Sequence, residues 1–335
     1  MSLIYIGAFP PGWGGVTIKN RDLYDALAEN GIPIKKIDLH KITRKKSIKE
    51  TFRLGYAILG RHNRYVIGIS TGMRRRFTHL LYVLNRRAMR RSIMIVMGGT
   101  ASQDIVENRK FMRWASEYKR IYVETASMAK ILEDAGMKNI ALYPNCRHES
   151  RTPFVKSINS GKLNCVFFSY IQMQKGVDII LEAAGELKNV GFVFWGNVDP
   201  TYENEFYQQI DRLPNCNYKG IFKGENESVY RELREYDILL FPTRWDTEGV
   251  PGILVEAKIA GLPCIVSNKS YNAELIKDGV EGIVMQTNDS ESLIRGINSL
   301  DHNREMLLRM SQESHNSAEE YYIEKYVSII SDDLL

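Results

Sequence analysis

The sequence predicts two doubly wound α/β domains that face each other across a cleft. Its 335 residues exceed the usual single domain of roughly 100–200 residues, so about two domains are expected. Short β-type apolar runs alternate with helical stretches along the chain, a pattern typical of βα units and parallel sheets. The composition, 44% hydrophobic and 25% charged, is that of a globular protein and excludes a disordered or fibrous chain.

The first series of elements starts at the beginning of the sequence. A buried strand is expected over 3–6, followed by a Gly/Pro-rich turn over 7–15 and a helix over 18–29 that ends at Asn30-Gly31. Helical segments separate the remaining strands of this series, which are expected at 34–39, 65–69, 92–97, 120–124 and 140–143.

The second series follows the polar stretch 155–161, which is the best linker candidate because it is short and ends in Gly161. Its strands are expected at 164–168, 191–195, 217–220, 237–241, 264–267 and 282–285, and its helices near Val177, Tyr202, Glu227, Gly252, Ala273 and Ser290. We therefore expect an N-terminal domain over 1–155 and a C-terminal domain over 156–313. Residues 314–335 are expected to form one further amphipathic helix that returns towards the N-terminal domain.

The charge is distributed unevenly along the chain, although the total is only +5. Residues 1–151 hold 28 Lys and Arg against 12 Asp and Glu, a net of +16, whereas the remainder holds 17 against 28, a net of −11. The segment 41–91 alone carries fifteen basic residues and a single acid, Glu50. Such a segment is expected to meet an anionic partner, which could be nucleic acid, a membrane surface or a phosphate-bearing substrate.

The four cysteines are widely spaced, contain no CxxC pair and do not cluster with histidine. They predict buried thiols rather than a zinc site or a disulfide framework. The first eighteen residues before Lys19 lack charge, but no basic stretch precedes them, and Pro and Gly interrupt any helix. Neither a signal peptide nor a membrane span is expected, so the sequence favours a cytoplasmic protein.

Three segments could carry chemistry. Gly14 and Gly15 lie between the first strand and a helix, where free N–H groups favour a phosphate, although a plain tight turn explains them equally well. Their turn matches neither GxGxxG nor a P-loop. Lys175 precedes the helix near Val177 and could neutralise a leaving diphosphate, or it could be an exposed first-turn lysine.

The densest candidate is the stretch 241–257, where a strand leads through a polar loop into a helix. Pro251 is expected in the first turn of that helix, which leaves the N–H groups of Gly252 and Ile253 for an anion or a sugar hydroxyl. Glu256 is flanked by apolar neighbours, which favours a polar ligand or a capping interaction over a solvated role. Glu248 lies eight residues earlier, and this spacing alone occurs often by chance.

Glu248-x7-Glu256 followed by Ala-Lys-Ile-Ala-Gly-Leu-Pro at 257–263 resembles the retaining glycosyltransferases of family 4, which have the GT-B fold. The Gly14-Gly15 turn and the motif that ends in Lys175-Gly176 match the same family in order and context. The resemblance covers essentially the whole chain and is most specific over 165–285.

The resemblance implies a role for each candidate residue. Lys175 would bind the diphosphate of a nucleotide-sugar donor, Glu248 would lie beside the transferred sugar, and these two are the expected catalytic residues. Glu256 would accept hydrogen bonds from the ribose, and Gly14 and Gly15 would approach the phosphates. The backbone of the loop would bind the sugar hydroxyls through Gly249, Val250, Gly252 and Ile253. No metal or other cofactor is expected, because Lys, Arg and helix N-termini stabilise the departing diphosphate.

Three positions depart from the family pattern. Tyr170 stands where the family usually has an Arg, and Arg244 is the candidate substitute for that cation. Pro251 replaces a frequent Gly. The family His at the end of the fourth strand is not evident, and Gly98-Gly99 stand there instead, either as a tight turn or as donors of backbone N–H groups.

The resemblance also implies the reaction and its setting. A hexosyl- or N-acetylhexosaminyltransferase would transfer a sugar, with UDP favoured over GDP, to a lipid-linked or other saccharide acceptor in bacterial O-antigen, capsule or exopolysaccharide synthesis. Segment 41–91, with Phe52, Tyr56, Phe77 and Leu81 among its apolar residues, would contact the anionic inner face of the cytoplasmic membrane. A solvated helix face would also explain these charges.

Two other functions are compatible with the sequence. One is a nucleotide-sugar epimerase. The other is a non-catalytic protein on a GT-B scaffold that binds membrane or nucleic acid, although no nucleic-acid partner is expected because no recognition motif is present.

Overall fold

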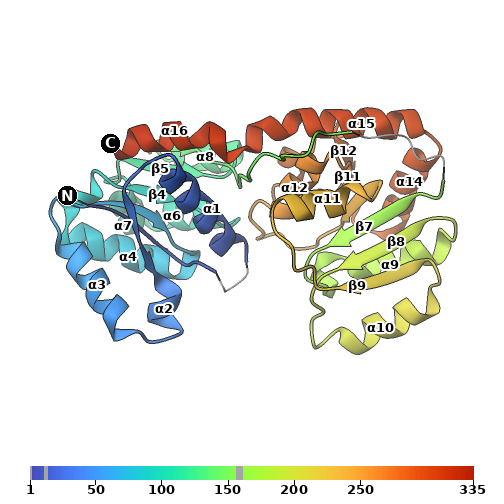
Figure 1. Ribbon diagram of the computed structural model, residues 1–335, viewed down its shortest axis with the longest axis horizontal. Helices are drawn as coiled ribbons and strands as arrows, with labels where there is room; N and C mark the ends of the chain where they lie inside the picture. The colour runs from blue at the N-terminus through green and yellow to red at the C-terminus, as the bar shows by residue number, and fades with distance from the viewer. Residues whose placement is uncertain (1, 11–13, 156–160) are drawn as a thin grey trace. The chain divides into compact units, whose positions relative to one another are not determined.

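The computed structural model describes residues 2–10, 14–155 and 161–335. The chain forms two compact units: unit 1 comprises Met1–His148, Thr247–Val250 and Tyr321–Leu335, and unit 2 comprises Glu149–Asp246 and Pro251–Glu320 (Figure 1). Residues 11–13 of the predicted turn and residues 156–160 of the predicted linker lie outside the described residues.

Unit 1 contains a six-stranded parallel sheet in the order β2-β1-β3-β4-β5-β6. The strands are β1 (Leu3–Gly7), β2 (Ile34–Asp38), β3 (Arg64–Gly68), β4 (Ile93–Ile95), β5 (Arg120–Val123) and β6 (Ile140–Leu142). The helices before residue 148 are α1 (Gly15–Glu29), α2 (Leu39–Thr43), α3 (Ile48–Leu59), α4 (Thr71–Leu84), α5 (Arg86–Met89), α6 (Ala101–Glu107), α7 (Arg109–Ala115) and α8 (Ala126–Asp134).

Unit 2 contains a second six-stranded parallel sheet in the order β12-β11-β10-β7-β8-β9. The strands are β7 (Asn164–Phe168), β8 (Gly191–Trp195), β9 (Cys216–Gly220), β10 (Ile238–Phe241), β11 (Cys264–Ser267) and β12 (Gly282–Met285). Its helices are η1 (Met173–Lys175), α9 (Val177–Glu186), α10 (Glu203–Arg212), α11 (Glu227–Arg234), α12 (Gly252–Ala260), α13 (Asn272–Leu275), α14 (Ser290–Asp301) and α15 (Arg304–Asn316). Every strand expected from the sequence overlaps an observed one, and the predicted fold class is confirmed.

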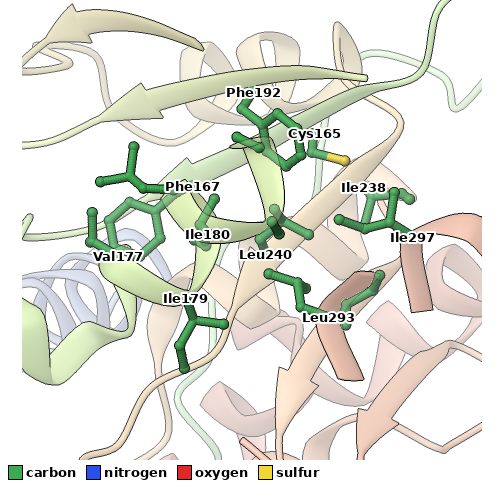
Figure 2. Packing of buried hydrophobic residues seen from close by; sticks show 14 of the residues in the cluster. Cys165, Phe167, Val177, Ile179, Ile180, Phe192, Ile238, Leu240, Leu293 and Ile297 are labelled. Carbon is green, nitrogen blue, oxygen red and sulfur yellow. The ribbon is translucent and has the colours of Figure 1, made fainter. Parts of the chain in front are cut away.

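The core of unit 2 lies between its sheet and the helices α9 and α14. Figure 2 shows Phe167 of β7, Leu240 of β10 and Ile180 of α9 packed with Leu293 and Ile297 of α14, all of them buried. The central strands β7 and β10 are nearly continuous apolar runs, as expected where helices cover both faces of a parallel sheet.

The predicted single helix over 314–335 is wrong. α15 ends at Asn316, the 3-10 turn η2 (Ser317–Tyr321) follows, and α16 (Ile323–Leu334) begins after Tyr322. Tyr322 has an extended backbone, and the segment pairs with Arg147 through the bonds Arg147 N to Tyr321 O and Ile323 N to Arg147 O, both 2.9 Å. These backbone bonds replace two that a continuous helix would have made.

α16 completes the core of unit 1. Val327, Ile330 and Leu334 are buried together with Leu23 and Leu27 of α1, and Figure 1 shows α1 and α16 side by side. Among the described residues, no helix is both long enough and apolar enough to cross a membrane.

The basic segment 41–91 is not uniformly exposed. Phe77 and Leu81, expected at a membrane surface, are buried in unit 1, and so is Arg74, which is 1% exposed. Arg86 and Arg90 pair with Glu117 of the turn after α7. Five exposed cations that form no ion pair with a described residue lie in or next to α2 and α3, and Arg75, Arg76 and Arg87 are exposed on α4 and α5.

Candidate functional site

In each sheet the strand order reverses direction at one point, called the topological switch point, because successive strands are added first on one side and then on the other. In unit 2 the chain passes from β7 to β8 on one side and reaches β10 on the other. Ligands of doubly wound sheets bind at the carboxyl ends of the strands at such a point. The loops after β7 and β10 contain Lys175 and Arg244 respectively, so the fold alone selects these two candidates.

The two loops are in direct contact. The Arg244 N–H donates to Gln174 O at 2.8 Å. Gly176 has φ 73°, and a Cβ there would lie 2.0 Å from Pro242 O. Any other residue at 176 would therefore be strained and would separate the loops. The glycine after Lys175 is thus required by the close approach of two backbones.

Lys175 is buried, with 8% of its surface exposed. It ends the 3-10 turn η1, so it is not the exposed first-turn lysine that the sequence left open. Its Nζ lies 5.2 Å from the ring centroid of Phe241 and 5.7 Å from that of Trp245. The rings attract the cation through their quadrupoles and hold it at the carboxyl edge of β10.

Arg244 is held by a carboxylate of its own unit. Its guanidinium donates to Asp178 Oδ1 at 2.6 Å and Oδ2 at 2.8 Å, and to Met173 O at 2.9 Å. The hydrogen bonds to Asp178 raise the pKa of Arg244. Sequence reasoning assigned no role to Asp178, although an acid in the first turn of α9 was visible. Because this carboxylate would compete with a diphosphate, donor binding by Arg244 stays a prediction.

Tyr170, which replaces the family Arg, donates to Asp199 Oδ2 at 3.2 Å and is 37% exposed. Asp199 also accepts from the backbone N–H of Thr201 at 2.8 Å. The hydrogen bond joins the loop after β7 to the loop between β8 and α10, and Tyr170 supplies no positive charge at this edge.

Pro251 is the N-cap of α12 rather than a residue of its first turn. Its extended ψ of 121° turns the chain into the helix, which begins at Gly252. The N–H groups of Gly252 and Ile253 are the first two of the helix and have no acceptor within the part of the chain that the structure describes. Glu256 follows one turn later and is partly buried.

The segment Thr247–Val250 belongs to unit 1, where it lies against the turn after β4. A Cβ at Gly99 would lie 2.2 Å from Glu248 O, and one at Gly249 would lie 3.2 Å from Glu124 Oε2. Asn145 Nδ2 donates to Val250 O at 2.8 Å. The glycine at 99 therefore serves a close backbone approach, which the sequence could not distinguish from a tight turn.

A buried ion pair that sequence reasoning missed lies beside this segment. Lys19 Nζ is 2.9 Å from Glu124 Oε1 and donates to Tyr143 O at 3.1 Å, and the two charged side chains are 1% and 4% exposed. Lys19 reads in sequence as an ordinary helical lysine of α1, so nothing in the pattern marked it.

Gly14 and Gly15 cap and begin α1, both exposed, and a Cβ at either position would meet nothing within 4 Å. They lie in unit 1 with Glu248, Gly249 and Val250. Lys175, Arg244, Gly252, Ile253 and Glu256 lie in unit 2. Within the described ranges no three His, Cys, Asp or Glu side chains gather as metal ligands.

Comparison with known proteins identifies the class of fold and then the family. The structure of Anabaena Alr3699/HepE in complex with UDP aligns over 100% of this chain and 99% of its own, with TM-score 0.74 and 13% identity. The pneumococcal O-GlcNAc transferase GtfA, solved with UDP and GlcNAc, aligns over 87% of this chain and 60% of its own, with TM-score 0.65 and 16% identity. These likenesses place the fold among the GT-B glycosyltransferases. The sequence model of the family described as "Glycosyl transferases group 1" matches residues 149–317, half of the chain, and the chain belongs to this family.

Sequence relatives match over shorter stretches. An Escherichia coli UDP-Gal:alpha-D-GlcNAc-diphosphoundecaprenol alpha-1,3-galactosyltransferase is 30% identical over 32% of this chain and 26% of its own length. The amylovoran biosynthesis glycosyltransferase AmsK of Erwinia amylovora is 30% identical over 42% of this chain and 33% of its own length. An uncharacterized protein of the Klebsiella pneumoniae cps region is 26% identical over 42% of this chain and 38% of its own length. The matched stretches thus span less than two fifths of these relatives.

Proposed function

We propose that this protein is a retaining family 4 glycosyltransferase that transfers a sugar from a UDP-sugar to a lipid-linked saccharide during synthesis of a bacterial cell-surface polysaccharide. The observation that carries the proposal is the contact between the loops after β7 and β10, which holds the buried Lys175 at the switch point of unit 2. Family membership, the named relatives in polysaccharide synthesis and the UDP-bound neighbours support it.

At the carboxyl edge of the unit 2 sheet, the residues would have to stabilise the charges that develop during sugar transfer. As the bond from the anomeric carbon to the diphosphate lengthens, negative charge builds on the leaving phosphate and positive charge on the sugar. Lys175 would bind the phosphate oxygens, and the N–H groups of Gly252 and Ile253 would donate to an anionic group or a sugar hydroxyl. Glu248 would lie beside the sugar and Glu256 would accept from the ribose. No metal is assigned in this scheme.

The proposal is tested by measuring nucleoside diphosphate release from a panel of UDP- and GDP-sugars, with and without a saccharide linked through diphosphate to a lipid. We expect release with a UDP-sugar that depends on the acceptor, and NMR of the product should show a retained anomeric configuration. Failure to bind or turn over any donor, combined with RNA or DNA binding that weakens steeply with salt, would overturn the enzymatic function.

We also propose that α3 and its approach contact an anionic membrane. The apolar side chains Ile48, Phe52, Tyr56 and Leu59 are 72%, 75%, 85% and 65% exposed, and their spacing places them along one side of the helix. Phe52, Tyr56 and Leu59 line a groove of about 960 Å³ along α3. Exposed apolar side chains on one helix face are typical of a helix that lies in a membrane interface.

The charged residues next to the exposed apolar face of α3 indicate which kind of lipid it would contact. Five exposed basic residues precede Phe52 and form no ion pair with any residue that the structure describes: Lys41, Arg44, Lys45, Lys46 and Lys49. The one acid nearby, Glu50, is buried and paired with Arg53 at 2.6 Å. The charge therefore favours anionic phospholipid over neutral lipid.

Sedimentation with vesicles tests this surface. The variant F52S/Y56S should bind phosphatidylglycerol vesicles more than tenfold less tightly, because burying each ring contributes about 1.5–3 kcal/mol. Ile329→Ser, which alters an exposed apolar residue of α16, is the matched control and should bind like the unaltered protein. Equal binding to neutral vesicles, or no effect of F52S/Y56S, would overturn the proposal.

A further inference from the structure

Arg74 is a buried cation with an unused hydrogen-bonding group. It lies in the first turn of α4, directly after β3, and is 1% exposed. Its Nε donates to Ile69 O at 3.3 Å and its Nη2 donates to Met97 O at 2.5 Å, at the carboxyl ends of β3 and β4. Nη1 is buried and has no partner among the residues described. A buried guanidinium N–H without an acceptor is costly unless a ligand supplies one.

Arg74 lines a hollow of about 460 Å³ within unit 1. The N-terminal residues Thr71 and Gly72 of α4 form part of its wall, as do Arg75 and Arg76. α4 has no acid in its first turn and no side-chain cap, so no side chain of its own offsets the positive end of the helix dipole at Thr71 and Gly72. Three consecutive arginines and a helix N-terminus at one hollow favour a phosphate.

The opposite wall carries an acceptor. Asp104 and Glu107 of α6 both line the same hollow. Glu107 is exposed to solvent, whereas Asp104 Oδ2 is buried without a hydrogen-bond partner among the described residues. No ion pair joins Asp104 to Arg74 in the described part of the chain. A ligand that satisfies both walls must accept hydrogen bonds at one end and donate them at the other. A phosphate next to a sugar hydroxyl has this combination.

We propose that this hollow binds a saccharide phosphate, with the phosphate on Arg74 and the α4 N-terminus and a sugar hydroxyl on Asp104. The inference deepens the proposed function and rests on it in one respect, since it identifies the ligand as the saccharide diphosphate of the lipid-linked acceptor. The site lies at the carboxyl edge of the sheet of unit 1, where parallel sheets bind their ligands. Figure 1 shows α4, α6 and α7 around this part of unit 1.

Titration calorimetry with three probes tests the site: GlcNAc diphosphate carrying a short alkyl chain, GlcNAc 1-phosphate and inorganic phosphate. We expect both saccharide phosphates to bind and inorganic phosphate to bind at least tenfold more weakly, because it offers Asp104 no sugar hydroxyl. Tighter binding of the alkyl diphosphate than of GlcNAc 1-phosphate supports a lipid-linked source, whereas equal binding contradicts that source. Inorganic phosphate binding as tightly as the saccharides would overturn the saccharide assignment.

Variants on both walls locate the site. R75Q/R76Q and Asp104→Asn should each weaken saccharide phosphate binding about tenfold, and Arg74→Met should abolish it. Arg87→Gln, an exposed arginine of α5 outside the hollow, is the control and should bind normally. Because Arg74→Met could unfold the protein, its thermal melting is measured, and R75Q/R76Q with Asp104→Asn decide the question if it does.

Binding of UDP separates this inference from the proposed function. All pocket variants should bind UDP like the unaltered protein, because Arg74 and the assigned donor residues of unit 2 belong to different units. Saccharide phosphate binding that is unaffected by R75Q/R76Q and Asp104→Asn would overturn the site even if the enzyme is active. Loss of transfer with every donor, with intact binding at the hollow, would instead overturn the proposed function alone.

Discussion

Arg244 and Asp178 form a two-pronged ion pair between residues far apart in sequence, with N–O distances of 2.6 and 2.8 Å. The pair joins the loop after β10 to the first turn of α9, immediately beyond Lys175. Planar pairing of this kind fixes orientation as well as distance. The Lys175 turn is therefore held in place by a residue outside its own motif.

Loss of this pair should loosen the turn. We expect Asp178→Asn and Arg244→Gln to lower UDP affinity by similar factors of up to about five, since a partly exposed pair contributes up to about 1 kcal/mol. The double variant should bind like either single one. Calorimetry measures all three. If Asp178→Asn bound UDP more tightly while Arg244→Gln bound it more weakly, the guanidinium would itself be a diphosphate ligand that Asp178 restrains.

Glu256→Ala should weaken UDP binding roughly tenfold or more, because a hydrogen bond from a ribose hydroxyl to a carboxylate contributes about 1.5–3 kcal/mol. Glu256→Gln, which keeps an acceptor oxygen, should retain part of the affinity. Uridine and UDP should lose affinity to the same degree, as both contain the ribose. Unchanged affinity in Glu256→Ala would refute the ribose assignment.

Lys175→Ala should lower kcat more than it lowers UDP-sugar affinity, provided that the contact with the phosphate strengthens as the bond breaks. The control Lys188→Ala removes an exposed lysine of the same unit and should leave both quantities unchanged. Steady-state kinetics and donor titration measure the two effects. An equal loss in kcat and affinity would indicate ground-state binding only.

The pair His148 and Glu324 makes the stability of unit 1 depend on pH. His148 Nδ1 lies 3.0 Å from Glu324 Oε1, and this hydrogen bond, assisted by Asp22 and Glu29, raises the pKa of His148. A raised folded-state pKa contributes stability that is complete below the unfolded value of about 6.5 and is lost as pH rises through the folded value. The Tm should therefore fall relative to that of His148→Gln as the pH rises above about 6.5. A constant difference between the two would contradict this.

A buried pair in unit 2 should be essential for stability. Lys258 Nζ lies 2.6 Å from Glu281 Oε2, and the side chains are 1% and 3% exposed. Lys258→Met would leave the buried Glu281 carboxylate with only the backbone N–H and the more distant, exposed ammonium of Lys277, and should cost about 3–5 kcal/mol in free energy of unfolding. Lys277→Ala removes an exposed lysine 3.8 Å from the same glutamate and should cost less than about 1 kcal/mol. Urea unfolding of both variants checks the contrast, and equal losses would refute it.

The fold could be predicted well from the sequence because each buried parallel strand is a continuous apolar run with a turn signal after it. Residues 164–168 and 282–285 match β7 and β12 without error. The end of the last helical segment could not be predicted. Its break at Tyr322 depends on backbone hydrogen bonds to Arg147, which lies 175 residues away in the sequence. The spacing of apolar residues within a helix does not indicate a backbone partner that is distant in sequence.

The residues of the candidate site also include some that the sequence could indicate and some that it could not. The sequence could place Lys175 and Gly176 in a loop before a helix because a strand end and a helix start are local signals, and their role in donor binding stays a prediction. Asp178 as the partner of Arg244, and Arg74 as a buried cation, were not found. Three arginines in a row read alike in sequence, and only the strand ends that accept from Arg74 show which of them is buried.

α16 has a consequence for the way the chain is made. Its apolar face fills the core of unit 1, yet it is synthesised 175 residues after His148, where the first stretch of that unit ends. At 5–20 residues per second, the ribosome adds this helix about 9–35 s later. During this time the sheet of unit 1 lacks α16, so the apolar face of α1 that packs against α16 stays uncovered while unit 2 is synthesised. The described core cluster of unit 2 consists of residues of unit 2 alone, so we expect unit 2 to be able to finish folding first.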